Sequence, residues 1–267
     1  MNSYPRDFYA FIRSGQVQLR REDIHHLSRQ TIHLAEGTSF SVQALITATG
    51  YSPRPPIQFL PVSIHSDLGI PTRSMTAEQS QMWTGLDAQA DSIIRAQFPR
   101  LLSGPYKSPS SNIVQPYVKY VDPELQYTPF RLYRTIAPPG LTANGEHSIV
   151  FIGYVSNIAA TIRLEMQCLW AYAYLTGKLK INRSKVIEDA SLMSRFHEYR
   201  SPYGHGRFFP DMVFDQMPFF DLLLKDLGLK TWRKANLLRE LFEPYGQEDY
   251  RGLVQEWLQG QQRTKQE

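Results

Sequence analysis

Cysteine is almost missing from this chain of 267 residues, because Cys168 is its only one. A single thiol excludes an internal disulfide and a cysteine-rich metal site, so a reducing compartment such as the cytoplasm is the expected location. Cys168 lies among apolar neighbours in a predicted helix, which indicates a core residue rather than a nucleophile. The amino terminus lacks the charged start and apolar run of a secretory signal, and we expect no targeting segment.

Long apolar runs and dense charge clusters are also absent. The longest mainly apolar stretch, residues 148–160, is interrupted by Gly153 and Asn157 and is shorter than the roughly twenty residues that span a bilayer. We therefore expect no transmembrane segment within this chain. The net charge of +4 is spread along the sequence without a basic patch, which argues against a nucleic-acid-binding protein.

Motifs of two common enzyme classes are missing as well. His25, His26 and His33 do not form a helical pair of metal ligands, and His197 with Glu198 lacks a second histidine. No serine stands in the G-x-S-x-G motif of a hydrolase. We therefore expect the first three histidines at the surface and neither a zinc site nor a hydrolase.

The first fifty residues predict a small sheet. An apolar share of 42% is enough for a packed core. Residues 16–20, 31–34 and 40–47 have the composition of three short strands, with a turn at 36–38. The third strand is apolar on both faces near its end, as in a sheet that helices cover on both sides. Prolines after Gly50 disfavour a helix, so we expect the chain to cross to another domain there.

The middle of the chain predicts one helix and one long irregular segment. Residues 76–98 are helix-compatible and Pro99 ends them, whereas 103–139 are rich in proline, tyrosine and serine without a clear period. The expected apolar stripe of the helix consists of Met82, Leu86, Ile93, Ile94 and Phe98.

A strand, a turn and a helix follow. Residues 148–153 are almost wholly apolar and predict a buried strand, and a helix at 160–176 is expected to stop at Gly177. A helical tail is expected after residue 180. The residues expected to pack the helix at 160–176 onto the sheet are Ile162, Met166, Leu169 and Ala173.

Two of these segments have features of ligand sites. Residues 45–51 end a strand in small side chains and Gly50, which let a ligand approach the backbone closely, although an ordinary tight turn explains them equally. Residues 151–157 lead into a helix whose start presents free N–H groups and a positive dipole end. That helix start suits an electron-rich group, and packing of the helix does not exclude this function.

In this order, the two segments resemble the flavin-containing monooxygenase family and its Baeyer-Villiger relatives. In that family an ATGY-type segment closes the NADPH-binding domain, and a strand-turn-helix near the C-terminus completes the FAD site. Residues 8–15 look like the helix and turn before the meander, and 165–170 look like an E-x-Q-x-x-W helix. The resemblance covers residues 4–178, and the tail is similar to that of fungal members.

The resemblance implies an α/β fold that is part of a flavoprotein with two dinucleotide-binding domains. Residues 1–52 then end the NADPH-binding domain, 53–147 form a linker, helix and loops, 148–180 close the FAD domain, and 181–267 form a helical C-terminal tail. FAD and NADPH are the implied cofactors. The implied reaction inserts one oxygen atom into a small-molecule substrate through a C4a-hydroperoxyflavin, in fungal secondary metabolism.

The resemblance also assigns six residues to cofactor binding, but no catalytic residue and no oligomeric state. They are Thr49, Gly50 and Tyr51 at the domain junction, and Ser156, Asn157 and Thr161 at the flavin edge. Arg131, Tyr133 and Arg134 either line a substrate or NADPH pocket or belong to a salt-bridged surface strand.

The two G-x-G-x-x-G loops that hold the dinucleotides in the family are absent. The one G-x-G, at Gly204 and Gly206, has no strand before it, so we expect this chain to begin downstream of both loops. Three explanations stay open at this point. They are a shortened monooxygenase, an inactive remnant that acts as an interaction partner, and an unrelated small-molecule-binding protein.

Overall fold

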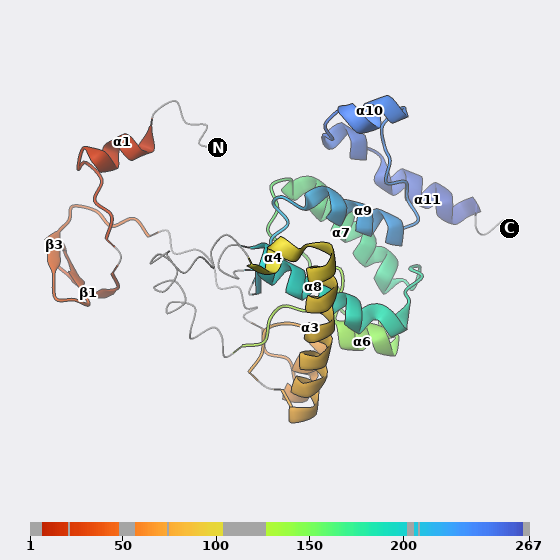
Figure 1. The fold of residues 1–267 in the computed structure, drawn as a ribbon, viewed down its shortest axis with the longest axis horizontal. Coiled ribbons are helices and arrows are strands. Elements are labelled where there is room, and N and C mark those ends of the chain that lie inside the picture. The colour runs from red at the N-terminus through yellow and green to blue at the C-terminus, as the bar shows by residue number, and fades with distance from the viewer. Residues whose placement is uncertain are drawn as a thin grey trace. The chain divides into compact units, whose positions relative to one another are not determined.

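The computed structural model describes residues 7–20, 22–47, 57–73, 75–103, 127–201, 206–207 and 209–263. The chain divides into two compact units, Met1–Ser52 and Pro53–Glu267, and each is described by itself (Figure 1). The first unit ends where the sequence predicts the end of the first domain. Its assignment to an NADPH-binding domain stays a prediction.

A short helix and a three-stranded antiparallel sheet make up the described part of the first unit. Strand β2 lies between β1 and β3. The predicted strand at 31–34 and the turn after it are confirmed, because Gly37 has a φ of +92° and donates its N–H to the carbonyl of Leu34. The elements are α1 (Phe8–Arg13), β1 (Ile24–Ser28), β2 (Thr31–Leu34) and β3 (Ser39–Ser41).

The first predicted strand is wrong. Residues 16–20 form no strand, and Ile24–Ser28 pairs with β2 instead. The two strands are joined by a tight turn in which Gln30 has a φ of +54°. Glycine, asparagine or aspartate normally occupies such a position, so the sequence carries no turn signal there.

The third predicted strand is correct only at its beginning. Strand β3 ends at Ser41, and the last ladder-like bond joins the N–H of Val42 to the carbonyl of Gln30 at 2.8 Å. The expected burial on both faces is also wrong, because Leu45 is 43% and Ile46 is 90% exposed. No strand in the described part of this unit lies beside residues 42–47, so their backbone has no partner with which to form a sheet.

The described part of the second unit is mainly helical (Figure 1). Its helices are η1 (Val62–Ile64), α2 (His65–Leu68), α3 (Ala77–Gln97), α4 (Pro99–Ser103), α6 (Pro139–Asn144), α7 (Ala160–Leu175), η3 (Arg183–Lys185), α8 (Val186–Arg200), α9 (Gln216–Asp226), α10 (Leu237–Phe242), η5 (Gln247–Tyr250) and α11 (Leu253–Arg263).

Helix α3 confirms the predicted helix at 76–98. A capping box joins Thr76 and Gln79 at its start, which satisfies backbone N–H groups that the helix leaves open. Its buried face differs from the predicted stripe, since Trp83, Ala90 and Ile94 are buried whereas Met82 and Ile93 are nearly half exposed. Helix α3 packs along α8 with polar as well as apolar residues, which apolar spacing alone does not reveal.

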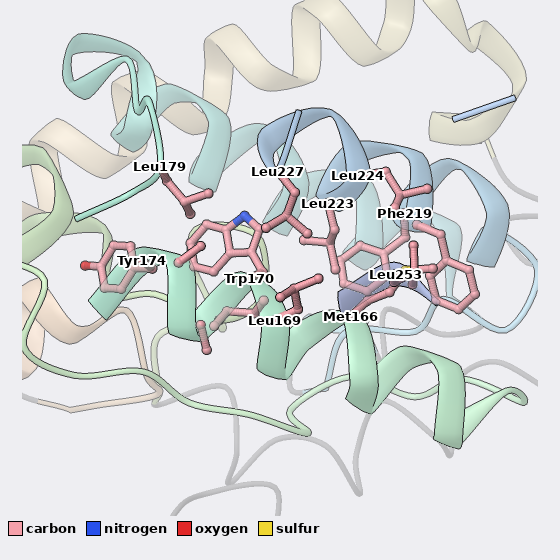
Figure 2. Close-up of a cluster of buried hydrophobic side chains, with 14 of the residues drawn as sticks. Met166, Leu169, Trp170, Tyr174, Leu179, Phe219, Leu223, Leu224, Leu227 and Leu253 are labelled. Atoms are coloured by element: carbon pink, nitrogen blue, oxygen red, sulfur yellow. The ribbon is translucent and has the colours of Figure 1, made fainter. Parts of the chain in front are cut away.

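Helix α7 confirms the predicted helix at 160–176, which stops at Gly177 with a φ of +67°. All four residues expected to pack it are buried. Figure 2 shows α7 against α9, with Trp170 at the centre of the cluster and Leu253 of α11 beside it. These large apolar side chains form the main core of the unit.

Two predictions about this region are wrong. Residues 148–153 form no strand, although the N–H of Phe151 donates to the carbonyl of Ile136 at 2.8 Å. Their apolar side chains are explained by packing onto the core rather than by a sheet, an ambiguity inherent in short apolar runs. Cys168 is exposed and not a core residue, because it lies two positions from the buried Met166 and so faces away.

The chain combines helices with a small sheet, so the mixed helix and strand content is confirmed. The described sheet is antiparallel, and the arrangement as part of a flavoprotein with two dinucleotide-binding domains stays a prediction. Among the described residues, no helix combines the length and the apolar character needed to cross a membrane.

Candidate functional site

The predicted cofactor-binding residues fall in two places. Residues 49–51 lie outside the part of the chain that the structure describes, so their place at a domain junction stays a prediction. Ser156, Asn157 and Thr161 lie together in the turn before α7 and in its first turn. This turn belongs to the second unit alone, and its geometry follows below.

Ser156 holds the turn through its backbone. Its N–H donates to the carbonyl of Pro210 at 2.8 Å, and its own carbonyl accepts from the N–H of Met212 at 2.8 Å. The two bonds form a short parallel bridge between Ser156 and Asp211. The segment before α9 therefore fixes the position of the turn before α7.

Asn157 shapes the same turn through its side chain. Its Oδ1 accepts a hydrogen bond of 2.6 Å from the N–H of Ala159, to which Gln216 Oε1 also lies at 3.3 Å. Its Nδ2 is buried and has no hydrogen-bond partner among the residues that the structure describes. A buried amide donor without a partner costs about 1–3 kcal/mol, so this group is suited to an acceptor supplied by a ligand.

Helix α7 begins with donors but without a side-chain cap. Ala159 is the N-cap residue and caps nothing, and Thr161 is exposed in the first turn. Arg163 is only 8% exposed, and its Nη1 donates to the carbonyl of Val155 at 2.9 Å. Its Nε has no partner, no carboxylate in the described residues pairs with it, and burial lowers its pKa.

The turn fits the edge of a flavin in three respects. Flavin rings carry carbonyl oxygens, for which the Asn157 amide and the uncapped N–H groups of α7 are matching donors. Gly153 has a φ of +91° with open space where a side chain would stand. Ile152 and Ile158 are exposed apolar residues on either side of the turn, at 38% and 76%.

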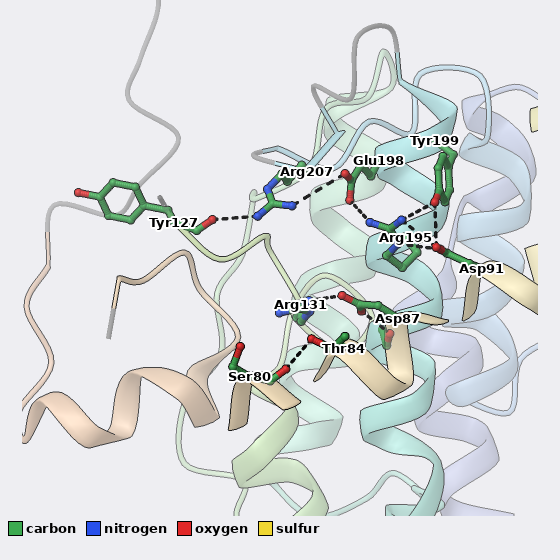
Figure 3. A network of polar contacts seen from close by, with 11 residues as sticks. Ser80, Thr84, Asp87, Asp91, Tyr127, Arg131, Arg195, Glu198, Tyr199 and Arg207 are labelled. Carbon is green, nitrogen blue, oxygen red and sulfur yellow. Dashed lines mark hydrogen bonds and ion pairs between the residues drawn. The ribbon is translucent and has the colours of Figure 1, made fainter. Parts of the chain in front are cut away.

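A cavity of about 290 Å³ opens beside α3 and is rich in arginine. We call it the arginine pocket, because Arg73, Arg131 and Arg207 line it and Asp87 is the one acidic residue in the described part of its lining. Figure 3 shows Arg131, Arg207 and Asp87 converging from three separate segments. The lining is therefore positively charged.

Arg131 is the buried centre of this pocket. It is 7% exposed, its Nη2 lies 2.5 Å from Oδ2 of Asp87, and its guanidinium stacks 4.4 Å from the ring of Trp83. Its Nε is buried without a partner. Burial lowers the pKa of Arg131, the cations Arg207 and Arg195 lower it further, and Asp87 acts in the opposite direction.

Ion pairs between α3 and α8 stand behind the pocket. Arg195 Nε donates to Asp91 Oδ1 at 2.7 Å, and Ser191 Oγ donates to Asp87 Oδ1 at 2.7 Å (Figure 3). Burial alone would lower the pKa of Arg195, but Asp91 and Glu198 raise it. These contacts fix Asp87, and through it Arg131, on a rigid helix pair.

Another cavity, of about 340 Å³, has an apolar wall and one charged end. Arg134 and Asp189 form the charged end, and residues of α3, α8 and α9 form the rest. Arg134 is held by Asp226 at 2.8 Å, which also accepts from Trp170 Nε1 at 2.9 Å. Arg134 and Thr135 have φ values of +54° and +58°, a conformation that costs non-glycine residues about 1 kcal/mol or more each.

Arg131, Tyr133 and Arg134 therefore combine both interpretations made from the sequence. Arg131 and Arg134 line cavities and are ion-paired, but Arg131 is buried, Arg134 is partly buried, and neither lies on a surface strand. Tyr133 is 5% exposed, and burial raises its pKa to about 12.

Comparison with known proteins finds similar fungal sequences. The chain is 34% identical to the FAD-dependent monooxygenase resA of Aspergillus sclerotiorum over 96% of its own length and 43% of that protein. It is 30% identical to the FAD-dependent monooxygenase avaB of Aspergillus versicolor, over 94% and 38%. This chain is similar to fungal FAD-dependent monooxygenases. It spans about two-fifths of the length of the curated relatives it matches.

The relationship to flavin-containing monooxygenases also reaches plants. A probable flavin-containing monooxygenase 1 of Arabidopsis thaliana is 28% identical over 38% of this chain and 19% of that protein. No family model matches the chain, and no solved structure matches it. The resemblance predicted from the two segments is thus confirmed by fungal monooxygenases, whose similarity extends over nearly the whole chain.

The arginine pocket was not predicted as a unit. Arg73 and Arg207 are far apart in the chain, and no spacing relates them to each other or to Arg131. One available signal was the pair Asp87 and Asp91, which are four residues apart on α3 and so share one helix face.

Proposed function

We propose that this chain is part of a FAD- and NADPH-dependent monooxygenase that inserts one oxygen atom into a small organic substrate. The observation that carries the proposal is the 34% identity to resA over 96% of the chain. In the proposed reaction the substrate, O₂, NADPH and a proton give the oxygenated product, NADP⁺ and water. FAD, once reduced by NADPH, supplies the oxygen-activating chemistry when it is bound.

In this proposal the residues of the turn before α7 bind and orient the flavin. Asn157 donates its buried amide N–H to a carbonyl oxygen of the flavin, and the first N–H groups of α7 contribute the positive end of the helix dipole. Ser156 keeps the turn against residues 210–212. Ile152 and Ile158 shield the ring from water, and excluding water strengthens the polar contacts around it.

The proposed domain roles follow the sequence analysis. Residues 1–52, with Thr49, Gly50 and Tyr51 at their end, form the last part of an NADPH-binding domain, and 148–180 close the FAD site. A role in fungal secondary metabolism and a cytoplasmic location belong to the same proposal.

A second candidate function is supported by exposed apolar residues. Helix α10 exposes four large side chains, which suits an inactive remnant or a piece that acts only together with another chain. These residues are Leu237, Leu238, Leu241 and Phe242.

Titration of the purified chain with FAD separates the two candidates. The proposal expects saturable binding with a shift of the flavin absorbance band, followed by substrate-dependent NADPH oxidation. Asn157→Asp keeps the Oδ1 acceptor for Ala159 and removes the amide donor, so FAD affinity should fall roughly tenfold. Asn144→Asp, on the exposed end of α6, is the matched control and should bind like the unaltered chain.

A colourless protein that FAD neither binds nor stabilises would contradict the proposal for this chain alone. That result favours the second candidate. Equal loss of affinity in Asn157→Asp and Asn144→Asp would instead contradict only the role given to Asn157.

A further inference from the structure

The arginine pocket holds more positive charge than its own residues neutralise. Among the described residues, three guanidinium groups line it against the single carboxylate of Asp87. That carboxylate is already engaged, since Oδ2 pairs with Arg131 and Oδ1 accepts from Ser191. Arg73 and Arg207 are thus left without a close carboxylate in the lining.

Arg207 is poorly neutralised by its neighbours. The nearest carboxylate oxygen, Oε1 of Glu198, lies 3.9 Å from its Nη1, while Oε2 of Glu198 is bound to Arg195 at 2.6 Å. Its Nη2 donates to the carbonyl of Tyr127 at 3.2 Å, and its Nε is buried without a partner. Donors of this guanidinium remain for a ligand.

Arg73 joins Arg207 through the same tyrosine. Its guanidinium lies 4.4 Å from the ring centre of Tyr127, whose carbonyl holds Arg207. No ion pair of Arg73 is present in the described residues, and its side chain is exposed at the pocket mouth. Arg73 is thus positioned by stacking, which leaves its N–H groups available to a ligand.

Arg131 supplies the buried floor of the site. Ninety-three per cent of its surface is covered, yet its Nε has no partner. Hydroxyl groups complete the set of donors, because Ser80 lines the pocket and Thr128 Oγ1 accepts from the N–H of Thr72 at 3.0 Å while keeping its own proton. All these groups are donors, so the complementary ligand is an acceptor with negative charge.

We propose that the arginine pocket binds a phosphate group of a ligand. Guanidinium groups that approach from different segments match the several oxygens of a tetrahedral dianion, whereas a planar carboxylate is saturated by one arginine fork. The volume of about 290 Å³ leaves room for a phosphate and part of the molecule that bears it. The inference does not rest on the proposed function, because it uses only the charge and geometry of this pocket.

Calorimetric titration with inorganic pyrophosphate tests the inference without flavin. We expect saturable binding with a Kd below about 1 mM, and weaker binding of acetate. Arg73→Gln and Arg207→Gln should each weaken pyrophosphate binding about tenfold, since each removes one charged partner. Arg95→Gln, on the exposed surface of α3 outside the pocket, makes the same charge change and should have no effect.

Titrations with larger ligands identify the molecule that carries the phosphate. Binding of NADP⁺ about tenfold tighter than NAD⁺, lost in Arg73→Gln, assigns the pocket to the 2′-phosphate of that cofactor. Tighter binding of FAD than of riboflavin, with the same loss, assigns it to the flavin diphosphate. Binding of pyrophosphate alone points to a phosphorylated substrate or free phosphate.

Two outcomes overturn the inference. One is the absence of binding for every phosphate compound at about 10 mM, with a circular dichroism spectrum that shows a folded protein. The other is binding that Arg73→Gln and Arg207→Gln leave unchanged, or that Arg95→Gln weakens equally.

Discussion

Two helix contacts in the second unit differ in the residues that form them. Helix α7 meets α9 through large apolar side chains that include Trp170, Leu223 and Leu224 (Figure 2). Helix α3 meets α8 through polar bonds in addition to apolar contacts, with Asp87 and Asp91 directed at partners on α8 and on the segment at 127–134 (Figure 3). We call the first the apolar interface and the second the polar interface.

The difference indicates a division of tasks. Burial of apolar surface is favourable without any particular geometry, so the apolar interface stabilises the fold. Buried ion pairs contribute little net stability after desolvation, but they require fixed positions. The polar interface lies directly behind the arginine pocket, and we infer that its main effect is to place Arg131 and the charges around it.

Trp170→Ala should have the largest effect, because it breaks the apolar interface at its centre. Trp170 is fully buried, and its Nε1 donates to Asp226, which would lose that donor. We expect the free energy of unfolding to fall by about 3–5 kcal/mol, a large share of the total for a domain. Urea denaturation followed by circular dichroism measures it.

Trp232→Ala is the matched control for this change. Trp232 is 64% exposed, so its loss should alter the free energy of unfolding by less than about 0.5 kcal/mol. A similar loss in both variants would show that the core is not centred on α7.

Lowering the pH should reduce the free energy of unfolding through His197 on α8. His197 is 1% exposed, and burial lowers its pKa to about 4, although a backbone hydrogen bond with Asp211 and the charge of Asp211 oppose the shift. The unfolded chain takes up this proton near its ordinary pKa of 6.5, and the folded protein does so only near 4. The free energy of unfolding is therefore highest above pH 6.5 and falls by about 3 kcal/mol from there to pH 4.

Comparison with His197→Gln isolates this contribution. Carboxylates also titrate in the lower part of the range, so the readout is the difference between the two denaturation series. The variant should lose stability less steeply between pH 6.5 and 4. Parallel curves for both proteins would mean that His197 is not held neutral in the fold.

The contrast between apolar and polar contacts also explains which parts of the structure the sequence predicts. The start, end and buried face of α7 follow from apolar spacing and from Gly177, because burial leaves a helical period. Strand β1 escapes prediction, since its turn at Gln30 uses no glycine. The Asn157 turn can be placed from its position before α7, but its unpartnered amide cannot.

The arginine pocket is not predictable from local sequence. Arg73, Arg131 and Arg207 reach it from three segments, and ion pairs leave no period in the sequence. Tertiary packing alone brings these charges together. The two acids of α3 show only that one face of the helix is charged, not which cations meet it.

The smallest expected effect tests whether the polar interface stabilises the fold or only positions the side chains of the arginine pocket. Asp91 takes two bonds from Arg195, at 2.7 and 3.0 Å, and one from Tyr199 at 2.9 Å. Asp91→Asn leaves the partly buried guanidinium of Arg195 with only Glu198 as a carboxylate partner among the described residues, and it should cost about 2 kcal/mol of unfolding free energy. Glu243→Gln, in an exposed pair with Arg239, is the control and should cost less than about 0.5 kcal/mol.

The double variant Asp91→Leu with Arg195→Met distinguishes stabilisation of the fold from positioning of the pocket. Removing both charges also removes their desolvation cost, and Glu198, which loses Arg195, still has Arg207 at 3.9 Å, so stability should return to within about 1 kcal/mol of the unaltered protein. Recovery of stability together with weaker pyrophosphate binding means that the polar interface orders the pocket rather than holding the fold. A double variant less stable than Asp91→Asn means that the ion pairs hold α3 to α8, and the two interfaces then differ in composition but not in task.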